Sequence, residues 1–400
     1  MSYLFLSCTK KILLKYRTGL IQLNFFKKDV FENIKKLDEQ KQKKIAAAQE
    51  LGKILVKSPG KFIWDSMALM TQSKSFESNS ILGNSKLNQL GLHRFRVQFA
   101  AKMAAQRRLK LSKSIHPADV ENFQKNGFIF KENFLATDEF EQLKQELLMT
   151  PLETRETLQG DTVTRRMALD GKTLNYMPVT KQFLHSDEWR NLLNYVASFK
   201  VQPISYLQVI FSHVRKAKAD PQTNLHSDTF HSSAKAWLFL EDVAEDEGPF
   251  VYVPGSHHLN PERLNWEQQK SESITAKTDA MTRRGSFRVS EEEVLQLGYA
   301  KAKSFSVKAN TLVIADTYGF HARGKSLRPS MRIELWAYAR RNPFVPWLGG
   351  DPLSLPFLRS NLVPLYWSGL DFLEKKYQRN NPWKKVGKKC ATDPAVLTSK

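Results

Sequence analysis

The sequence predicts a mainly β protein with helices, in which short strands form a jelly roll or barrel. From about residue 200, short apolar runs alternate with turn residues such as Gly248-Pro249 and Pro254-Gly255. Because no long helices separate these runs, they favour a jelly roll or barrel over a parallel α/β sheet. The charge adds a second observation: the chain carries a net charge of +21, yet residues 116–345 hold 29 basic and 29 acidic side chains. Bulk positive charge therefore does not account for what this central block does.

Length and charge together predict three segments. A chain of 400 residues exceeds the size of one hydrophobic core. Residues 1–115 carry 23 basic and 7 acidic side chains, and residues 346–400 carry 9 and 4. We therefore expect a basic helical extension over residues 1–115, a β domain over residues 116–345 and a basic tail over residues 346–400.

The extension reads as two helices joined by a linker. Val30, Phe31, Ile34 and Leu37 fall on one helical face, and the Ser- and Asn-rich stretch from Thr71 to Asn84 resembles a linker. The second helix has an apolar stripe and a basic remainder; the stripe consists of Leu92, Phe95, Phe99 and Met103. Such a helix either packs its stripe on the domain behind it or lies on an anionic membrane surface. No recognised nucleic-acid motif accompanies the charge, so we do not expect nucleic-acid binding.

The β domain opens with a helix, a short strand and a second helix. Gly127 breaks the first helix, residues 128–130 form the strand, and Thr137 is expected to cap the start of the second helix, with acids in its first turn. Further strands are expected within residues 203–214, 234–243, 249–257, 304–316 and 330–340. The tail either wraps the barrel or reaches a partner.

A metal site is suggested by the triplet His226-Ser227-Asp228. On an extended segment, residues i and i+2 point to the same side, so both side chains can reach one ion. A non-haem Fe(II) centre needs two imidazoles and one carboxylate on one face of the metal. The triplet alone is weak evidence, because it also occurs as an ordinary turn.

His321 is the best third ligand. It follows the apolar strand and glycine-containing turn "NTLVIADTYGF", which can return its ring to the barrel mouth. Eleven residues later, Arg332 lies inside an alternating strand. A mid-strand arginine that points inward needs an anionic partner, either a dicarboxylate cosubstrate or Glu334 on the same strand face. We interpret the remaining histidines of the block as neighbours or loop residues: His213, His231, His257 and His258.

Together these residues resemble the phytanoyl-CoA dioxygenase family of Fe(II)- and 2-oxoglutarate-dependent oxygenases. The resemblance rests on His226-Ser227-Asp228, "EDEGPFVYVPGSH", His321 and Arg332, and it covers about residues 117–342. It implies a double-stranded β-helix core (jelly-roll or cupin-like) in which His226, Asp228 and His321 hold iron. It further implies that Arg332 binds the distal carboxylate of 2-oxoglutarate, with Lys235 and Gln208 as further contacts.

The resemblance implies a hydroxylase, because halogenating relatives carry a small residue where this chain has Asp228. The implied reaction converts 2-oxoglutarate and O₂ into succinate and CO₂ and hydroxylates a C–H bond of a small-molecule, lipid or glycolipid substrate. The alternative is a jelly-roll module that binds a ligand without turnover. The oligomeric state does not follow from the sequence.

The expected location is the cytoplasm, and peripheral contact of the basic flanks with an anionic membrane is a further hypothesis. Cys8 and Cys390 lie near opposite ends, which offers neither a disulfide framework nor a cysteine metal site. The N-terminus is apolar first and basic afterwards, the reverse of a secretory signal.

Overall fold

The computed structural model describes residue 35 and residues 38–218 and 220–397. The chain divides into two compact units, Met1–Trp64 and Asp65–Lys400. The first unit contains a helix over residues 38–57; the predicted face of Val30, Phe31, Ile34 and Leu37 lies outside the described residues. None of the described helices is both long and apolar enough to span a membrane.

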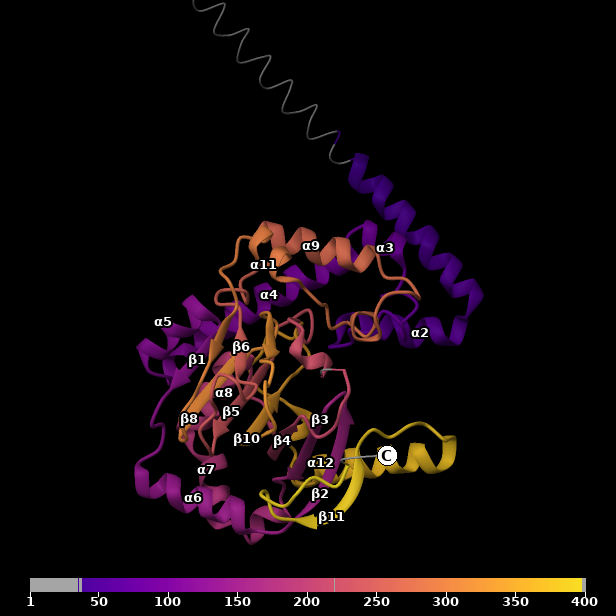
Figure 1. Ribbon diagram of the computed structural model, residues 1–400. Coiled ribbons are helices and arrows are strands. Elements are labelled where there is room, and N and C mark those ends of the chain that lie inside the picture. The colour runs from indigo at the N-terminus through magenta and orange to yellow at the C-terminus, as the bar shows by residue number, and fades with distance from the viewer. Residues whose placement is uncertain (1–34, 36–37, 219, 398–400) are drawn as a thin grey trace, which may run out of the picture. The chain divides into compact units, whose positions relative to one another are not determined.

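The second unit is built on two antiparallel sheets (Figure 1). The larger sheet has the strand order β1-β8-β5-β10-β4-β3-β2-β11, and the smaller has the order β7-β6-β9. The strands of the larger sheet are β1 (Phe128–Lys131), β2 (Leu152–Gln159), β3 (Thr162–Ala168), β4 (Ile204–Ser212), β5 (Ala234–Phe239), β8 (Thr311–Asp316), β10 (Ser330–Ala339) and β11 (Lys384–Lys389). Those of the smaller sheet are β6 (Phe250–Tyr252), β7 (Lys303–Phe305) and β9 (His321–Arg323). The predicted double-stranded β-helix class is confirmed.

The two faces of the larger sheet serve different purposes, as the alternation along β10 shows. Ile333, Leu335 and Ala337 join the main hydrophobic core, which α6, α7 and α8 cover. Trp336 belongs to a second cluster between the two sheets, with Phe250 of β6. Because successive side chains of a strand point to opposite faces, Arg332 and Glu334 share this inner face with Trp336. The inner face is where polar side chains gather.

Helices precede, cover and follow the sheets. Besides the helix over residues 38–57, the α-helices of the described chain are α2 (Pro59–Met67), α3 (Ser85–Gln89), α4 (Leu92–Leu111), α5 (Pro117–Asn126), α6 (Thr137–Met149), α7 (Pro178–His185), α8 (Asp187–Ala197), α9 (Pro261–Glu272), α10 (Ala280–Arg283), α11 (Glu291–Gln296) and α12 (Pro356–Tyr377). The predicted helix–strand–helix opening corresponds to α5, β1 and α6. The prediction that Thr137 caps this helix is wrong: Thr137 is already the first helical residue, and Ala136 occupies the cap position without a side-chain hydrogen bond.

The prediction of a linker from Thr71 to Asn84 is wrong. Phe76, Ile81 and Leu82 are buried, and the Phe76 ring stacks on Phe287 with centroids 5.5 Å apart. The polar side chains that suggested a linker instead satisfy buried groups: the Asn79 Oδ1 atom accepts the N–H groups of Ile81 and Leu82, both at 2.9 Å. The segment is a packed part of the second unit.

Helix α4 packs on the domain, but only partly through the predicted stripe. Val97, Ala100 and Met103 are buried, whereas Phe95 of the predicted stripe is 56% exposed. Two of its arginines are buried as well, and they bind backbone carbonyls: Arg107 donates to Ser198 O at 2.8 Å and to Val345 O at 2.7 Å. These arginines therefore contribute to packing rather than to an open basic surface.

Four strands escaped prediction, and one lies in the tail. β2 and β3 have charged sequences, LETRETLQ and TVTRRMA, which hide their strand character. β9 has only three residues. β11 pairs with β2, so the tail adds an edge strand to the larger sheet.

Candidate functional site

Backbone pairing brings His226, Asp228 and His321 to one end of the space between the sheets. His226 and His321 exchange two backbone hydrogen bonds of 3.0 Å each, so their rings lie on adjoining segments. The Asp228 N–H donates to Thr317 O at 2.9 Å, which fixes the carboxylate on the same side. His321 opens β9 directly after the turn that contains Gly319.

Gly319 is required in that turn. A Cβ atom there would lie 1.9 Å from the Tyr252 hydroxyl, which itself donates to Asp316 O at 2.8 Å. The Gly319 carbonyl in turn accepts from the His321 ring. The glycine thus permits the close approach that orients a site residue.

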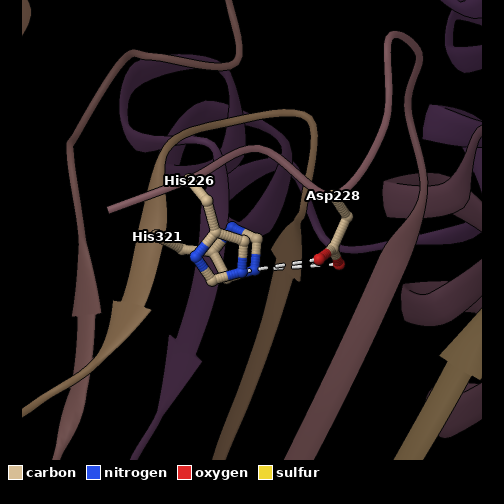
Figure 2. Close-up of side chains that lie close together, drawn as sticks. All are labelled: His226, Asp228 and His321. Atoms are coloured by element: carbon tan, nitrogen blue, oxygen red, sulfur yellow. Dashed lines mark ion pairs between the residues drawn. The ribbon is translucent and has the colours of Figure 1, made fainter. Parts of the chain in front are cut away.

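The three side chains converge on one point (Figure 2). Asp228 Oδ1 lies 3.6 Å from His226 Nε2, and Asp228 Oδ2 lies 3.7 Å from His321 Nε2. One ligand atom from each residue lies within 4.8 Å of the others. Among the described residues, this is the one group of three or more His, Cys, Asp and Glu side chains with such spacing.

The hydrogen bonds of the two rings fit metal binding. Nδ1 of His226 lies 2.8 Å from Asn224 O, and Nδ1 of His321 lies 3.0 Å from Gly319 O. Since a carbonyl can only accept, each Nδ1 carries the proton and each Nε2 keeps its lone pair for a ligand. The buried His321 Nε2 has no hydrogen-bond partner among the described residues. A buried polar atom without a partner is costly, and a metal ion would supply that partner.

The charge states also suit a metal. Burial lowers the pKa of His226, and burial lowers that of His321 to about 3, so both rings are neutral. Burial alone would raise the pKa of Asp228, but the ammonium group of the nearby Lys235 holds it well below its ordinary value. Two neutral imidazoles and an ionised carboxylate are the protonation states that metal binding requires.

A cavity of about 360 Å³ begins at this group and contains all three predicted cosubstrate residues, Arg332, Lys235 and Gln208. Its volume lies within the usual range of ligand pockets, roughly 300–1,000 Å³. The cavity is thus large enough for a small molecule.

Arg332 pairs with Glu334, one of the two anionic partners that the sequence left open. Its Nε lies 2.9 Å from Glu334 Oε2, although without the angle of a hydrogen bond. One of its terminal nitrogens donates to the Gly248 carbonyl. Gln208 lies behind this pair and donates to Glu334 Oε1 at 2.6 Å. Arg332 therefore lines the cavity while Glu334 balances its charge.

Lysines flank the aspartate on two sides. Lys235 Nζ lies 2.6 Å from Asp228 Oδ2. Lys74 comes from the segment that was predicted to be a linker, and it donates to the Asp228 backbone carbonyl. Burial lowers the pKa of Lys74 to about 8. The sequence carried no signal for Lys74, because its proximity depends on how residues 71–84 fold.

The other histidines stay outside the cluster. His213 lies 2.6 Å from Ser326 O through its Nε2. His231 is buried and binds Ser232 O at 2.9 Å. The rings of His257 and His258 lie with their centroids 3.9 Å apart and their planes tilted by 40°. Their interpretation as neighbours and loop residues agrees with the structure.

Two further arginines line the cavity and were missed. Arg323 lies two residues after His321 on β9 and contacts Asp220 at 2.6 Å. The i and i+2 rule applied to His321 could have found it. Arg166 lies on β3, whose strand character the sequence concealed.

A jelly roll with two histidines and an aspartate between its sheets is an arrangement typical of Fe(II)- and 2-oxoglutarate-dependent oxygenases. Residues 123–304 match the family model of phytanoyl-CoA dioxygenase (PhyH). This segment is therefore similar to the PhyH family over slightly less than half of the chain, and together with the three side chains it indicates an enzyme with Fe(II) as cofactor and 2-oxoglutarate as cosubstrate. The match includes His226 and Asp228 and ends before His321. His321 is therefore assigned to the site by its distance from the other two side chains, and not by the family match.

Solved structures of similar architecture are remote. HygX from Streptomyces hygroscopicus, solved with nickel and 2-oxoglutarate, is 15% identical; the match covers 56% of this chain and 87% of that one, with a TM-score of 0.36. For the epimerase SnoN from nogalamycin biosynthesis the identity is 15%, the coverages 68% and 93%, and the TM-score 0.36. The carbocyclase SnoK from the same biosynthesis is 17% identical; the match covers 60% of this chain and 94% of that one, with a TM-score of 0.36. Among curated proteins, none matches the chain significantly.

Proposed function

We propose that this enzyme hydroxylates a C–H bond of a small-molecule, lipid or glycolipid substrate, and that His226, Asp228 and His321 hold its iron. The observation that carries the proposal is the pair of proton-free Nε2 atoms that face one ionised carboxylate. Bound Fe(II) with 2-oxoglutarate supplies the O₂-dependent oxidation: one oxygen atom enters succinate as CO₂ leaves, and the other enters the substrate as hydroxyl.

The residues of this chain bind and orient the reactants. Arg332 would bind the distal carboxylate of 2-oxoglutarate, since a guanidinium fork matches a carboxylate. Lys235 and Gln208 line the same cavity and stay predictions as further contacts. Apolar rings, among them Trp237 and Phe250, line the cavity and would limit the access of water.

The test is succinate release from 2-oxoglutarate with Fe(II) and O₂. Asp228→Ala should lose this turnover, because it removes the carboxylate ligand. His213→Ala is the matched control, since it removes a histidine of the same domain that lies outside the cluster. Full turnover by Asp228→Ala would refute the proposal. Binding of Mn(II) and 2-oxoglutarate by the native chain without any turnover would favour a ligand-binding module instead.

We further propose peripheral contact with an anionic membrane through the basic tail. Exposed apolar side chains on α12 support this: Phe357, Leu365, Tyr366, Phe372 and Tyr377. Lys375 and Lys376 lie in the last turn of the same helix. Exposed aromatic rings beside lysines suit the interface of acidic lipids. Phe372→Ser should weaken co-sedimentation with phosphatidylserine vesicles at low salt; equal sedimentation of variant and native chain would refute the contact.

The cytoplasm is our proposed location, because the two cysteines at opposite ends of the sequence suit a reducing compartment. Cell fractionation tests this, and recovery only from an oxidising compartment would contradict it.

A further inference from the structure

The cavity carries more positive charge than the metal and cosubstrate need. Five cations line it: Lys74, Arg166, Lys235, Arg323 and Arg332. Three of them face carboxylates. Lys235 pairs with Asp228, Arg323 with Asp220, and Arg332 with Glu334.

The other two cations have only neutral partners in the described chain. Lys74 donates to a backbone carbonyl, and the Nε of Arg166 donates to the amide oxygen of Gln208 at 2.8 Å. Fe(II) and the 2-oxoglutarate dianion cancel each other's charge. Loading the site with both therefore leaves two positive charges in a partly buried space, which favours an anion.

Arg166 is held ready for such an anion. Its guanidinium lies over the rings of Trp336 at 4.3 Å, Trp383 at 4.8 Å and Tyr206 at 5.0 Å. Gln208 fixes its Nε, and Glu334 fixes Gln208. The two terminal nitrogens make no hydrogen bond within the described residues. A fixed guanidinium with a free terminal fork matches a carboxylate or phosphate.

The position of Arg166 separates it from the cosubstrate anchor. Arg332 lies opposite Ile210 in the pairing of β10 with β4, whereas Arg166 lies opposite Gln208 in the pairing of β4 with β3. β4 therefore stands between the two arginines. Aromatic side chains line the cavity around Arg166, so an apolar body attached to the anion would find rings to pack on.

We propose that the substrate is an acid with an apolar body, whose carboxylate or phosphate binds the free fork of Arg166. The proposal rests on the oxygenase function and deepens it by naming the substrate class. Lys74 adds the second unpaired charge from outside the segment that matches the family.

The experiment uses the full chain loaded with Mn(II) and 2-oxoglutarate without O₂, and it measures binding by calorimetry. The probes are phenylacetate, phenyl phosphate and the neutral phenylacetamide. A charge-assisted pair predicts that at least one anion binds roughly tenfold to a hundredfold more tightly than the amide. The stronger of the two anions distinguishes a carboxylate from a phosphate substrate.

Arg166→Gln should reduce anion binding to the level of the amide, while the affinities for Mn(II) and 2-oxoglutarate stay unchanged. Arg379→Gln, which removes one exposed positive charge in the tail, should keep the preference for the anion. Equal binding of anions and amide by the native chain would overturn the proposal, and so would an unchanged preference in Arg166→Gln. Loss of 2-oxoglutarate affinity in Arg166→Gln would overturn it too, because Arg166 would then be the cosubstrate anchor. Failure of the native chain to bind Mn(II) and 2-oxoglutarate would instead refute the oxygenase function itself.

Discussion

Arg165 and Arg166 are neighbours on β3, yet the structure uses them in opposite ways. Arg165 lies on the outer face of the larger sheet with its side chain fully buried. Its guanidinium contacts Glu156 at 2.7 Å and donates to four carbonyls of the tail, among them Asp393 O and Pro394 O at 2.6 Å. Glu156 in turn accepts the N–H groups of Val396 and Leu397 at 2.9 Å. Every donor of Arg165 has a partner.

Arg166 points to the inner face and keeps its terminal fork free. The same contrast separates the Glu156–Arg165 pair from the His226, Asp228 and His321 group, in which His321 Nε2 has no hydrogen-bond partner in the described part of the chain. For the two arginines of β3, the complete set of hydrogen bonds accompanies a structural position, whereas the incomplete set lies at a cavity where a ligand would complete it. The state of their hydrogen bonds, rather than burial alone, distinguishes the two roles.

The largest effect on stability is expected on the outer face. Arg165→Met leaves Glu156 buried without its cation and should lower the free energy of unfolding by about 3–5 kcal/mol. Urea unfolding measures this. A free energy of unfolding within about 0.5 kcal/mol of the native value would show that the pair of Arg165 and Glu156 does not stabilise the fold.

Metal binding should have the next largest effect. Mn(II) at a hundred times its dissociation constant should raise the free energy of unfolding by about 2.7 kcal/mol, because it binds only the folded state. Thermal unfolding with and without the metal measures this. Asp228→Ala should show no such rise, and an equal rise in that variant would place the metal elsewhere.

A smaller and pH-dependent effect is expected at Arg155, which lies opposite Arg166 in the β2–β3 pairing. Both Asp371 oxygens accept from Arg155 at 2.6 Å, and this lowers the pKa of Asp371 to about 2. A lowered carboxyl pKa stabilises the fold above the ordinary value near 3.8. That stability disappears as the pH falls from about 4 to about 2.

Because Asp371 is partly exposed, the pair should contribute less than about 1 kcal/mol. Urea unfolding of the native chain and Asp371→Asn between pH 2 and pH 6 measures it. Identical pH profiles for the two proteins would show that the pair of Arg155 and Asp371 does not stabilise the fold.

The smallest effect on stability should be that of Arg166→Met. Since no carboxylate loses its partner, the free energy of unfolding should change by less than about 1 kcal/mol, in either direction. This contrasts with Arg165→Met, one residue away. A loss of several kcal/mol in Arg166→Met would mean that its cation–π contacts are structural, which would erase the distinction between the two arginines.

The sequence predicted the core strands and the three ligand candidates because both follow local rules. Strand periodicity revealed β4, β5, β8 and β10, and the spacing of His226 and Asp228 revealed one face. Arg166 escaped because the charged sequence of β3 masks its alternation. Lys74 escaped because only tertiary packing brings residues 71–84 to the site. The segment was mistaken for a linker, since Ser and Asn mark loops whether or not their side chains satisfy a buried backbone.

The partition into residues 1–115, 116–345 and 346–400 stays a prediction. β11 from the tail completes the sheet, and α4 from the extension packs on the domain, both within the unit Asp65–Lys400. The distribution of charge identified the basic flanks, residues 1–115 and 346–400. It carried no information on which parts of these flanks pack against the sheets.

The central claim is that His226, Asp228 and His321 together hold one divalent metal ion. Calorimetric titration of the chain with Mn(II), in the presence of 2-oxoglutarate and without O₂, tests it most directly. The account predicts one ion per chain for the native protein and for His213→Ala, and no measurable binding for Asp228→Ala or His321→Ala. Native stoichiometry and affinity in both ligand variants would contradict it.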